Sequence, residues 1–180
     1  MKIRLAADIQ TDSIVDGQGI RSVIWTQGCS HNCPFCHNPG THSFHGGDLV
    51  ELDDVISKLN DLSGQDGVTF SGGDPMFQPK PCKILAKKIH ELGMNVWAYT
   101  GFTYEELIQS KNKDILGFLK EIDILVDGKF EIDKKSLDLN YRGSSNQRII
   151  DVQKSLKENK VVTLNLEKKN ESHTTNLIYI

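Results

Sequence analysis

The sequence predicts an α/β protein whose mostly parallel sheet forms a partial, open barrel. Stretches rich in β-branched and aromatic residues alternate with amphipathic helical patterns, which is the order of βαβ units. The chain has 180 residues, enough for one domain with a sizeable core, and too few strand-like stretches for a closed barrel. We expect one domain over residues 1–160 and an extension over 161–180 that packs on the same domain.

Four strands are predicted from their β-branched and aromatic residues. They cover residues 21–27, 67–70, 94–99 and 122–126. Each is followed by glycine or by polar residues, so functional loops are expected to leave the carboxyl ends of the strands, as in other parallel sheets.

Apolar residues at helical spacing predict the intervening helices. These cover residues 52–62, 81–92 and 115–119, with a further short helix after the capping box of Thr103 and Glu106. The spacing of Ile149, Val152 and Leu156 predicts one more helix. Residues 161–166 and 176–180 are expected to form two short strands.

Composition excludes several functional classes. Hydrophobic residues make up 38% and charged residues 25%, which is typical of a soluble globular protein. The net charge of −3 argues against a nucleic-acid partner. No apolar run is long enough to span a membrane, and the first residues do not resemble a signal peptide. We therefore expect a cytoplasmic protein with no membrane partner.

Three cysteines, Cys29, Cys33 and Cys36, follow the first predicted strand at a C-x3-C-x2-C spacing. Thiolates are soft ligands, so this cluster indicates a metal or iron–sulfur site. A self-sufficient four-iron cluster needs four protein thiolates, and the segment offers only three.

Three interpretations of this segment remain open. The first is a structural zinc site that uses His31 or His37 as its fourth ligand. The second is an electron-transfer cluster that recruits Cys82, although a lone cysteine at a helix start is more typical of packing. The third is a four-iron cluster with one iron left open for a substrate. His31, His42 and His45 are expected to be polar surface residues.

Two further motifs follow predicted strands. Ser71-Gly72-Gly73-Asp74-Pro75 offers backbone without Cβ atoms, which lets a ligand approach closely, and a plain turn is the simpler interpretation. Asp127-Gly128-Lys129 lies at the end of another strand, so its charges are expected at the same edge, and a simple β-turn is the alternative.

These motifs resemble those of the radical S-adenosylmethionine (SAM) enzymes. The cysteine spacing has Phe35 just before the last cysteine, and residues 71–75 resemble that superfamily's Gly-Gly-Glu-Pro motif, with Asp74 in place of Glu. Within the superfamily, residues 126–130 and Arg142-Gly143-Ser144-Ser145-Asn146-Gln147 are similar to the anaerobic ribonucleoside-triphosphate reductase activating proteins. The resemblance covers residues 16–147.

The resemblance implies a partial barrel of radical SAM type and an activase. A [4Fe-4S] cluster on Cys29, Cys33 and Cys36 would cleave SAM, and the resulting radical would take a hydrogen atom from a glycine of the anaerobic reductase. Flavodoxin or ferredoxin would supply electrons, and no side-chain acid or base would be needed. The implied cofactor-binding residues are Phe35, Cys36, His37, Gly72, Gly73, Asp74, Asp127 and Lys129.

Other functions remain as alternatives. A pyruvate formate-lyase activase would, as that family's pattern implies, carry Asp-Thr-Asn-Gly where this chain has Ala98-Tyr99-Thr100-Gly101. An enzyme similar to 7-carboxy-7-deazaguanine synthase is a second radical SAM alternative. A non-catalytic iron–sulfur or zinc module is the alternative from a different class.

Overall fold

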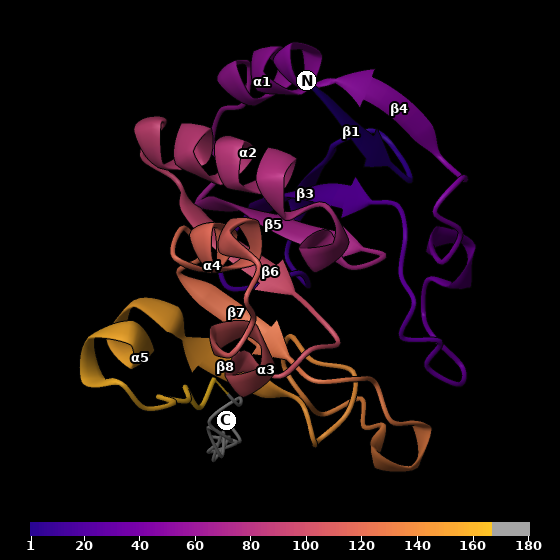
Figure 1. Ribbon diagram of the computed structural model, residues 1–180, viewed down its shortest axis with the longest axis vertical. Coiled ribbons are helices and arrows are strands. Elements are labelled where there is room, and N and C mark those ends of the chain that lie inside the picture. The colour runs from indigo at the N-terminus through magenta and orange to yellow at the C-terminus, as the bar shows by residue number, and fades with distance from the viewer. Residues whose placement is uncertain (167–180) are drawn as a thin grey trace, which may run out of the picture.

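A single sheet positions the functional motifs, and the computed structural model describes residues 1–166 of the chain. Its strands are β1 (Lys2–Leu5), β2 (Gln10–Ser13), β3 (Arg21–Thr26), β4 (Asp48–Glu51), β5 (Gly67–Gly72), β6 (Asn95–Tyr99), β7 (Ile124–Asp127) and β8 (Arg148–Asp151). They lie in the order β4-β1-β3-β5-β6-β7-β8, and β2 pairs with β3 outside that path (Figure 1).

The four middle strands, β3, β5, β6 and β7, are parallel. At the edges the pairing is antiparallel, with β8 on β7 and with β1 on both β3 and β4. The sheet is therefore a mixed, open sheet around a parallel centre, which confirms the predicted α/β class. All four predicted strands are those of the parallel centre.

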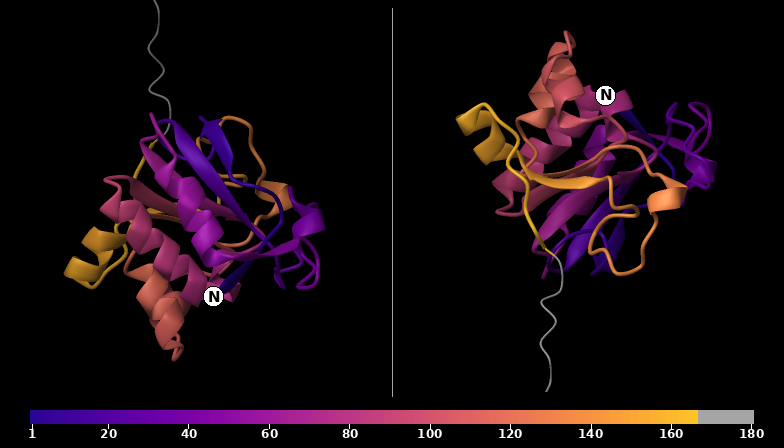
Figure 2. Two further views of the ribbon diagram at one scale, coloured as in Figure 1. Left: turned by 90° about the horizontal axis from the view of Figure 1, so that it is seen from above. Right: turned by 90° about the horizontal axis from the view of Figure 1, so that it is seen from below.

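Helices connect and cover these strands. They are α1 (Leu52–Asn60), α2 (Pro79–Glu91), α3 (Tyr104–Ile108), α4 (Lys113–Leu119) and α5 (Val152–Glu158), with 3-10 turns η1 (Pro39–Thr41), η2 (Pro75–Phe77) and η3 (Ile132–Lys134). Figures 1 and 2 show α1, α2 and α4 side by side on one face of the sheet. Among residues 1–166, no helix has the length and apolar character needed to cross a membrane.

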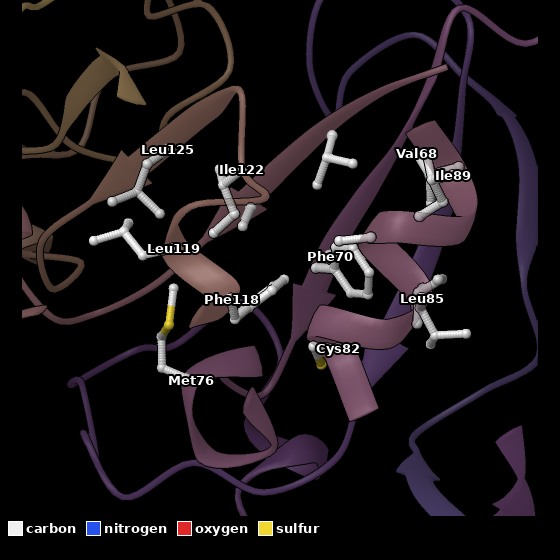
Figure 3. Close-up of a cluster of buried hydrophobic side chains, with 14 of the residues drawn as sticks. Val68, Phe70, Met76, Cys82, Leu85, Ile89, Phe118, Leu119, Ile122 and Leu125 are labelled. Carbon is white, nitrogen blue, oxygen red and sulfur yellow. The ribbon is translucent and has the colours of Figure 1, made fainter. Parts of the chain in front are cut away.

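The helix-covered face of the sheet carries the main hydrophobic core. Because successive strand residues point to opposite faces, Val68 and Phe70 of β5 both face the helices. The Phe70 ring meets Phe118 of α4 edge to face, with 5.3 Å between ring centroids, and Cys82 and Leu85 of α2 lie beside them (Figure 3).

The opposite face of the sheet carries a smaller hydrophobic cluster of Trp97, Val126 and Ile149, next to the buried Arg21. Arg21 has no exposed surface there, and it donates hydrogen bonds to Thr69 and Asn95 while its guanidinium lies 5.2 Å from the Trp97 ring centroid. Burial lowers the pKa of Arg21 to about 10. This arginine joins the amino-terminal ends of β3, β5 and β6, at the end of the sheet opposite the cysteines.

Most predicted helices are confirmed, with shifted ends. The capping box of Thr103 and Glu106 forms both of its hydrogen bonds. The prediction that Ile149 belongs to the last helix is wrong, because Ile149 pairs with Val126 in β8 and α5 begins only at Val152, after its cap Asp151.

The predicted strand over 161–166 is not formed as a strand, and Thr163 makes only an isolated bridge to Ile150. Residues 161–166 still run beside β8, where the Leu164 N–H donates to the Ile149 carbonyl at 2.7 Å. The strand predicted over 176–180 lies outside the described residues, and the division at residue 160 stays a prediction.

Candidate functional site

The cysteine loop, residues 28–38, leaves the carboxyl end of β3. Two of its non-glycine residues, Asn32 and Phe35, have positive φ angles of 51° and 57°. L-residues rarely adopt this left-handed conformation, and here it turns the chain sharply between successive cysteines. As predicted, the loop projects from the edge of the sheet where the parallel strands end (Figure 1).

The loop carries three free, partly buried thiols. The pKa of Cys29 is raised to about 11, because the effect of burial outweighs the opposing effect of the backbone N–H of His31. The backbone N–H of Asn38 donates to the Cys36 sulfur at 3.4 Å. Backbone donors of this kind suit thiolates bound to iron, whose charge they help to stabilise.

Three thiols on one loop are the ligand type that iron–sulfur clusters use. Within residues 1–166, no three His, Cys, Asp or Glu side chains are arranged to hold one metal ion. A four-iron cluster attaches each cysteine to a different iron, so its ligands lie further apart than those around one zinc. Cys82 has no exposed surface and belongs to the hydrophobic core, where burial raises the pKa of its thiol.

The glycine loop, residues 72–77, follows β5 and lies against the start of the cysteine loop. A Cβ on Gly72 would lie 2.5 Å from the Thr26 carbonyl oxygen, and one on Gly73 would lie 2.5 Å from that of Gly28. The Asp74 N–H also donates to the Gly28 carbonyl at 3.0 Å. The glycines are therefore required by close backbone packing, of Gly72 on the end of β3 and of Gly73 on the cysteine loop, a reason that the sequence did not indicate.

Asp74 holds the glycine loop to its neighbours. Its side chain is 1% exposed, and Oδ1 accepts from the Met76 N–H at 2.9 Å. Oδ2 accepts from Thr100 Oγ1 at 2.8 Å and from the Gly101 N–H at 2.9 Å, and it lies 2.7 Å from His31 Nε2. This carboxylate is engaged by protein groups on both oxygens, so a direct contact with a nucleotide stays a prediction.

The expectation for His31 is wrong, because its side chain is 8% exposed and is bound to Asp74. Sequence reasoning missed this histidine because a position between two cysteines gave no sign of where its ring points. His42 is partly buried and His45 is exposed, so of these three histidines only His45 is a fully exposed surface residue.

Asp127 ends β7 and is also engaged inside the protein. Its side chain is 1% exposed, and it accepts hydrogen bonds from the Tyr104 N–H at 2.7 Å and from Arg148 Nε at 3.0 Å. Arg148 donates in addition to Glu105. These hydrogen bonds raise the pKa of Arg148, and the bond to Asp127 has a larger effect than the bond to Glu105. Whether Asp127 also approaches a ligand stays a prediction.

The segment 142–147 builds the turn that carries Lys129. The Gln147 amide donates to the Gly128 carbonyl at 3.0 Å, and the Asn146 amide donates to the Lys129 carbonyl at 2.8 Å. Lys129 itself is exposed. The pKa of Glu106 is lowered mainly by its hydrogen bonds with Thr103, and the positive charge of Lys129 lowers it further. The segment thus acts as a support for the turn, a role that its sequence did not specify.

The far end of the cysteine loop meets this turn. The rings of His37 and Phe130 lie 4.6 Å apart, and a Cβ on Gly143 would come within 3.0 Å of both. Both views of Figure 2 show the loop over 128–147 (orange) beside the cysteine loop (purple). Phe35 is 78% exposed and therefore available to a bound molecule.

Comparisons with known proteins agree with this arrangement. The family of 4Fe-4S single cluster domains matches residues 15–150. A protein from Salmonella typhi, named anaerobic ribonucleoside-triphosphate reductase-activating protein, is 38% identical over 142 residues, 74% of this chain and 90% of the relative. A protein of the same name from Escherichia coli K12 is 35% identical over 143 residues, with the same coverage.

Among solved structures, QueE from Escherichia coli matches with a TM-score of 0.47 and 16% identity, over 57% of this chain and 54% of that one. The matched 4Fe-4S family spans the cysteine loop, the glycine loop, the turn at Lys129 and the segment 142–147 together.

Proposed function

The chain belongs to the family of anaerobic ribonucleoside-triphosphate reductase-activating proteins, and from this premise we propose how its residues generate a glycyl radical on that reductase. It carries an iron–sulfur cluster domain. The proposal assigns the cluster to Cys29, Cys33 and Cys36, and SAM to the iron that lacks a protein ligand.

One observation supports this assignment above the others: the cysteine loop contacts both other loops of the site. At one end His31 lies 2.7 Å from Asp74 of the glycine loop, and at the other the His37 ring packs on Phe130 beside Lys129. These segments lie far apart in sequence and are brought to one edge of the sheet. Such convergence favours a single site for a cluster and a nucleotide.

When bound, the cluster supplies the electron that breaks the C5′–S bond of SAM, giving methionine and, once a hydrogen atom has left the partner's glycine Cα, 5′-deoxyadenosine. The protein holds, orients and shields these groups. The cysteine thiols must lose their protons to bind iron, and the backbone N–H groups of His31 and Asn38 stabilise the thiolates at Cys29 and Cys36.

The remaining residues would hold the nucleotide. The backbones of Phe35, Cys36 and His37 would contact the adenine, and the exposed Phe35 ring would pack against it. The methionine end would lie along the backbone of the glycine loop, and the ammonium of Lys129 would attract its carboxylate. Asp74, already engaged by protein donors, would keep the glycine loop in place, and Asp127 would likewise keep the end of β7 in place.

The partner and the electron source follow from the same proposal. The protein substrate is the anaerobic ribonucleoside-triphosphate reductase, and flavodoxin or ferredoxin is the proposed reductant. A cytoplasmic location stays a prediction, as does the absence of a nucleic-acid partner.

Anaerobic reconstitution tests the proposal. We expect about four iron and four sulfide per chain, 5′-deoxyadenosine on reduction with SAM, and a glycyl radical by EPR when the reductase is added. Cys36→Ala should lose the cluster, and the matched control Cys82→Ala should keep it. Stoichiometric zinc without SAM cleavage, or loss of the cluster in Cys82→Ala, would contradict the proposal.

A further inference from the structure

The His31 side chain is held on several sides by residues outside the cysteine loop. Its ring meets Phe102 edge to face at 4.5 Å between centroids and lies 5.7 Å from Phe77. A Cβ on Gly101 would lie 2.5 Å from ring carbon Cδ2, so glycine leaves room for it. Packed on these sides and 8% exposed, the imidazole has little freedom to turn.

The polar edge of the ring is fixed as well. Nε2 lies 2.7 Å from Asp74 Oδ2, and because an ionised carboxylate only accepts, Nε2 carries the hydrogen and donates it. Thr100 and Gly101 donate to the same oxygen. Hydrogen bonds to a buried carboxylate are short and directional, so the ring and the glycine loop have one mutual orientation.

The backbone of the same residue belongs to the cysteine loop. His31 lies two residues after Cys29 and two residues before Cys33, so its backbone is part of the path between two of the three cysteines. One residue therefore joins two proposed iron ligands along the chain and contacts the glycine loop, through Asp74, with its side chain. A further hydrogen bond between these loops runs from the Asp74 N–H to the Gly28 carbonyl, one residue before Cys29.

We propose that His31 is a positioning residue that fixes the cysteine loop, and with it the cluster, relative to the loop that holds SAM. The inference rests on the proposed function and adds a role for a residue that binds neither cofactor. Its effect is geometric: the electron donor and the C5′–S bond must be held in register, and a misplacement of about 1 Å in such a site costs on the order of a hundredfold in rate.

The first test replaces the imidazole. His31→Ala keeps all three cysteines, so its iron content should match that of the native protein. We expect SAM to bind at least tenfold more weakly to the reduced enzyme, and 5′-deoxyadenosine to form on the order of tenfold to a hundredfold more slowly. In EPR, the reduced cluster should match the native spectrum without SAM and differ from it with saturating SAM.

A conservative variant and a matched control accompany this measurement. His31→Gln retains an N–H donor for Asp74, so it should recover part of the affinity and rate. His45→Ala removes an exposed histidine a short distance along the chain and should leave iron content, affinity and rate unchanged. Near-native SAM binding and rate in His31→Ala, loss of its iron, or a glutamine variant no better than alanine would each overturn the inference.

A double variant tests whether the two side chains act together. Asp74→Asn keeps the shape of the acceptor and removes its charge, and it serves as the second probe should His31→Ala fail to fold. If the pair acts as a unit, the double variant His31→Ala/Asp74→Asn should form 5′-deoxyadenosine no more slowly than the slower of the two single variants. Losses in rate that add up in the double variant would overturn the inference. Native enzyme that fails to cleave SAM would instead refute the proposed function itself.

Discussion

Arg21 offers a test of stability that leaves the site untouched. Its guanidinium makes five hydrogen bonds, to Thr69, Gln18, Val68 and twice to Asn95, with no exposed surface. In Arg21→Lys the charge remains, while the single ammonium offers three donors from one atom, so at least two bonds are lost. At about 1 kcal/mol for each lost bond and a similar penalty for each buried acceptor left unpaired, we expect a loss of about 2–4 kcal/mol.

Urea unfolding of the full-length, cluster-free chain, followed by circular dichroism, measures this loss. With a slope of about 2 kcal/mol per molar urea, the midpoint should fall by about 1–2 M. Lys2→Arg, an exposed residue paired with Glu51, is the control and should leave the midpoint unchanged. Iron loading of Arg21→Lys should remain native, because the cysteines lie at the opposite end of the sheet. A midpoint shift below about 0.25 M would refute the energetic reasoning.

Three further outcomes are expected. Gly73→Ala places a Cβ 2.5 Å from a carbonyl oxygen of the cysteine loop, so 5′-deoxyadenosine formation should fall at least about tenfold, and an unchanged rate would contradict the packing argument. Phe118→Ala removes a fully buried ring and should cost about 3–5 kcal/mol of unfolding free energy, measured by the same urea titration. The Arg148 hydrogen bond lowers the pKa of Glu105, so its stabilisation is present above the ordinary glutamate pKa and is lost as pH falls. Below about pH 5 the native chain should therefore lose stability more steeply than Glu105→Gln, and parallel pH profiles would show that this pair contributes nothing.

The central strands could be predicted because composition and spacing act locally. β-Branched runs followed by glycine mark β3 and β5, and the box at Thr103 fixes where α3 begins. Ile149 was misplaced because its spacing to Val152 fits a helix, whereas pairing with Val126 across the sheet favours a strand. Such tertiary pairing has no local signature, and it overrides helical spacing over so short a segment.

The candidate site shows the same division. The motifs single out the cysteines and glycines as candidates, yet they do not indicate the partners of Asp74 and Asp127. Each carboxylate is bound by residues distant in sequence, His31 and Arg148 respectively. A motif identifies which residue types a site needs, and only the fold decides which charge is used to hold the structure together.

The bracing of the cysteine loop also has a consequence for biosynthesis. The loop is made early, yet its far end at His37 rests on Phe130 and Gly143, which are synthesised 93 and 106 residues later. Contacts so distant in sequence form late in folding. A nascent chain therefore exposes three thiols without these supporting contacts for most of its synthesis. Under the proposed function, the cluster can be assembled on a completed loop only after translation has passed the β7–β8 connection.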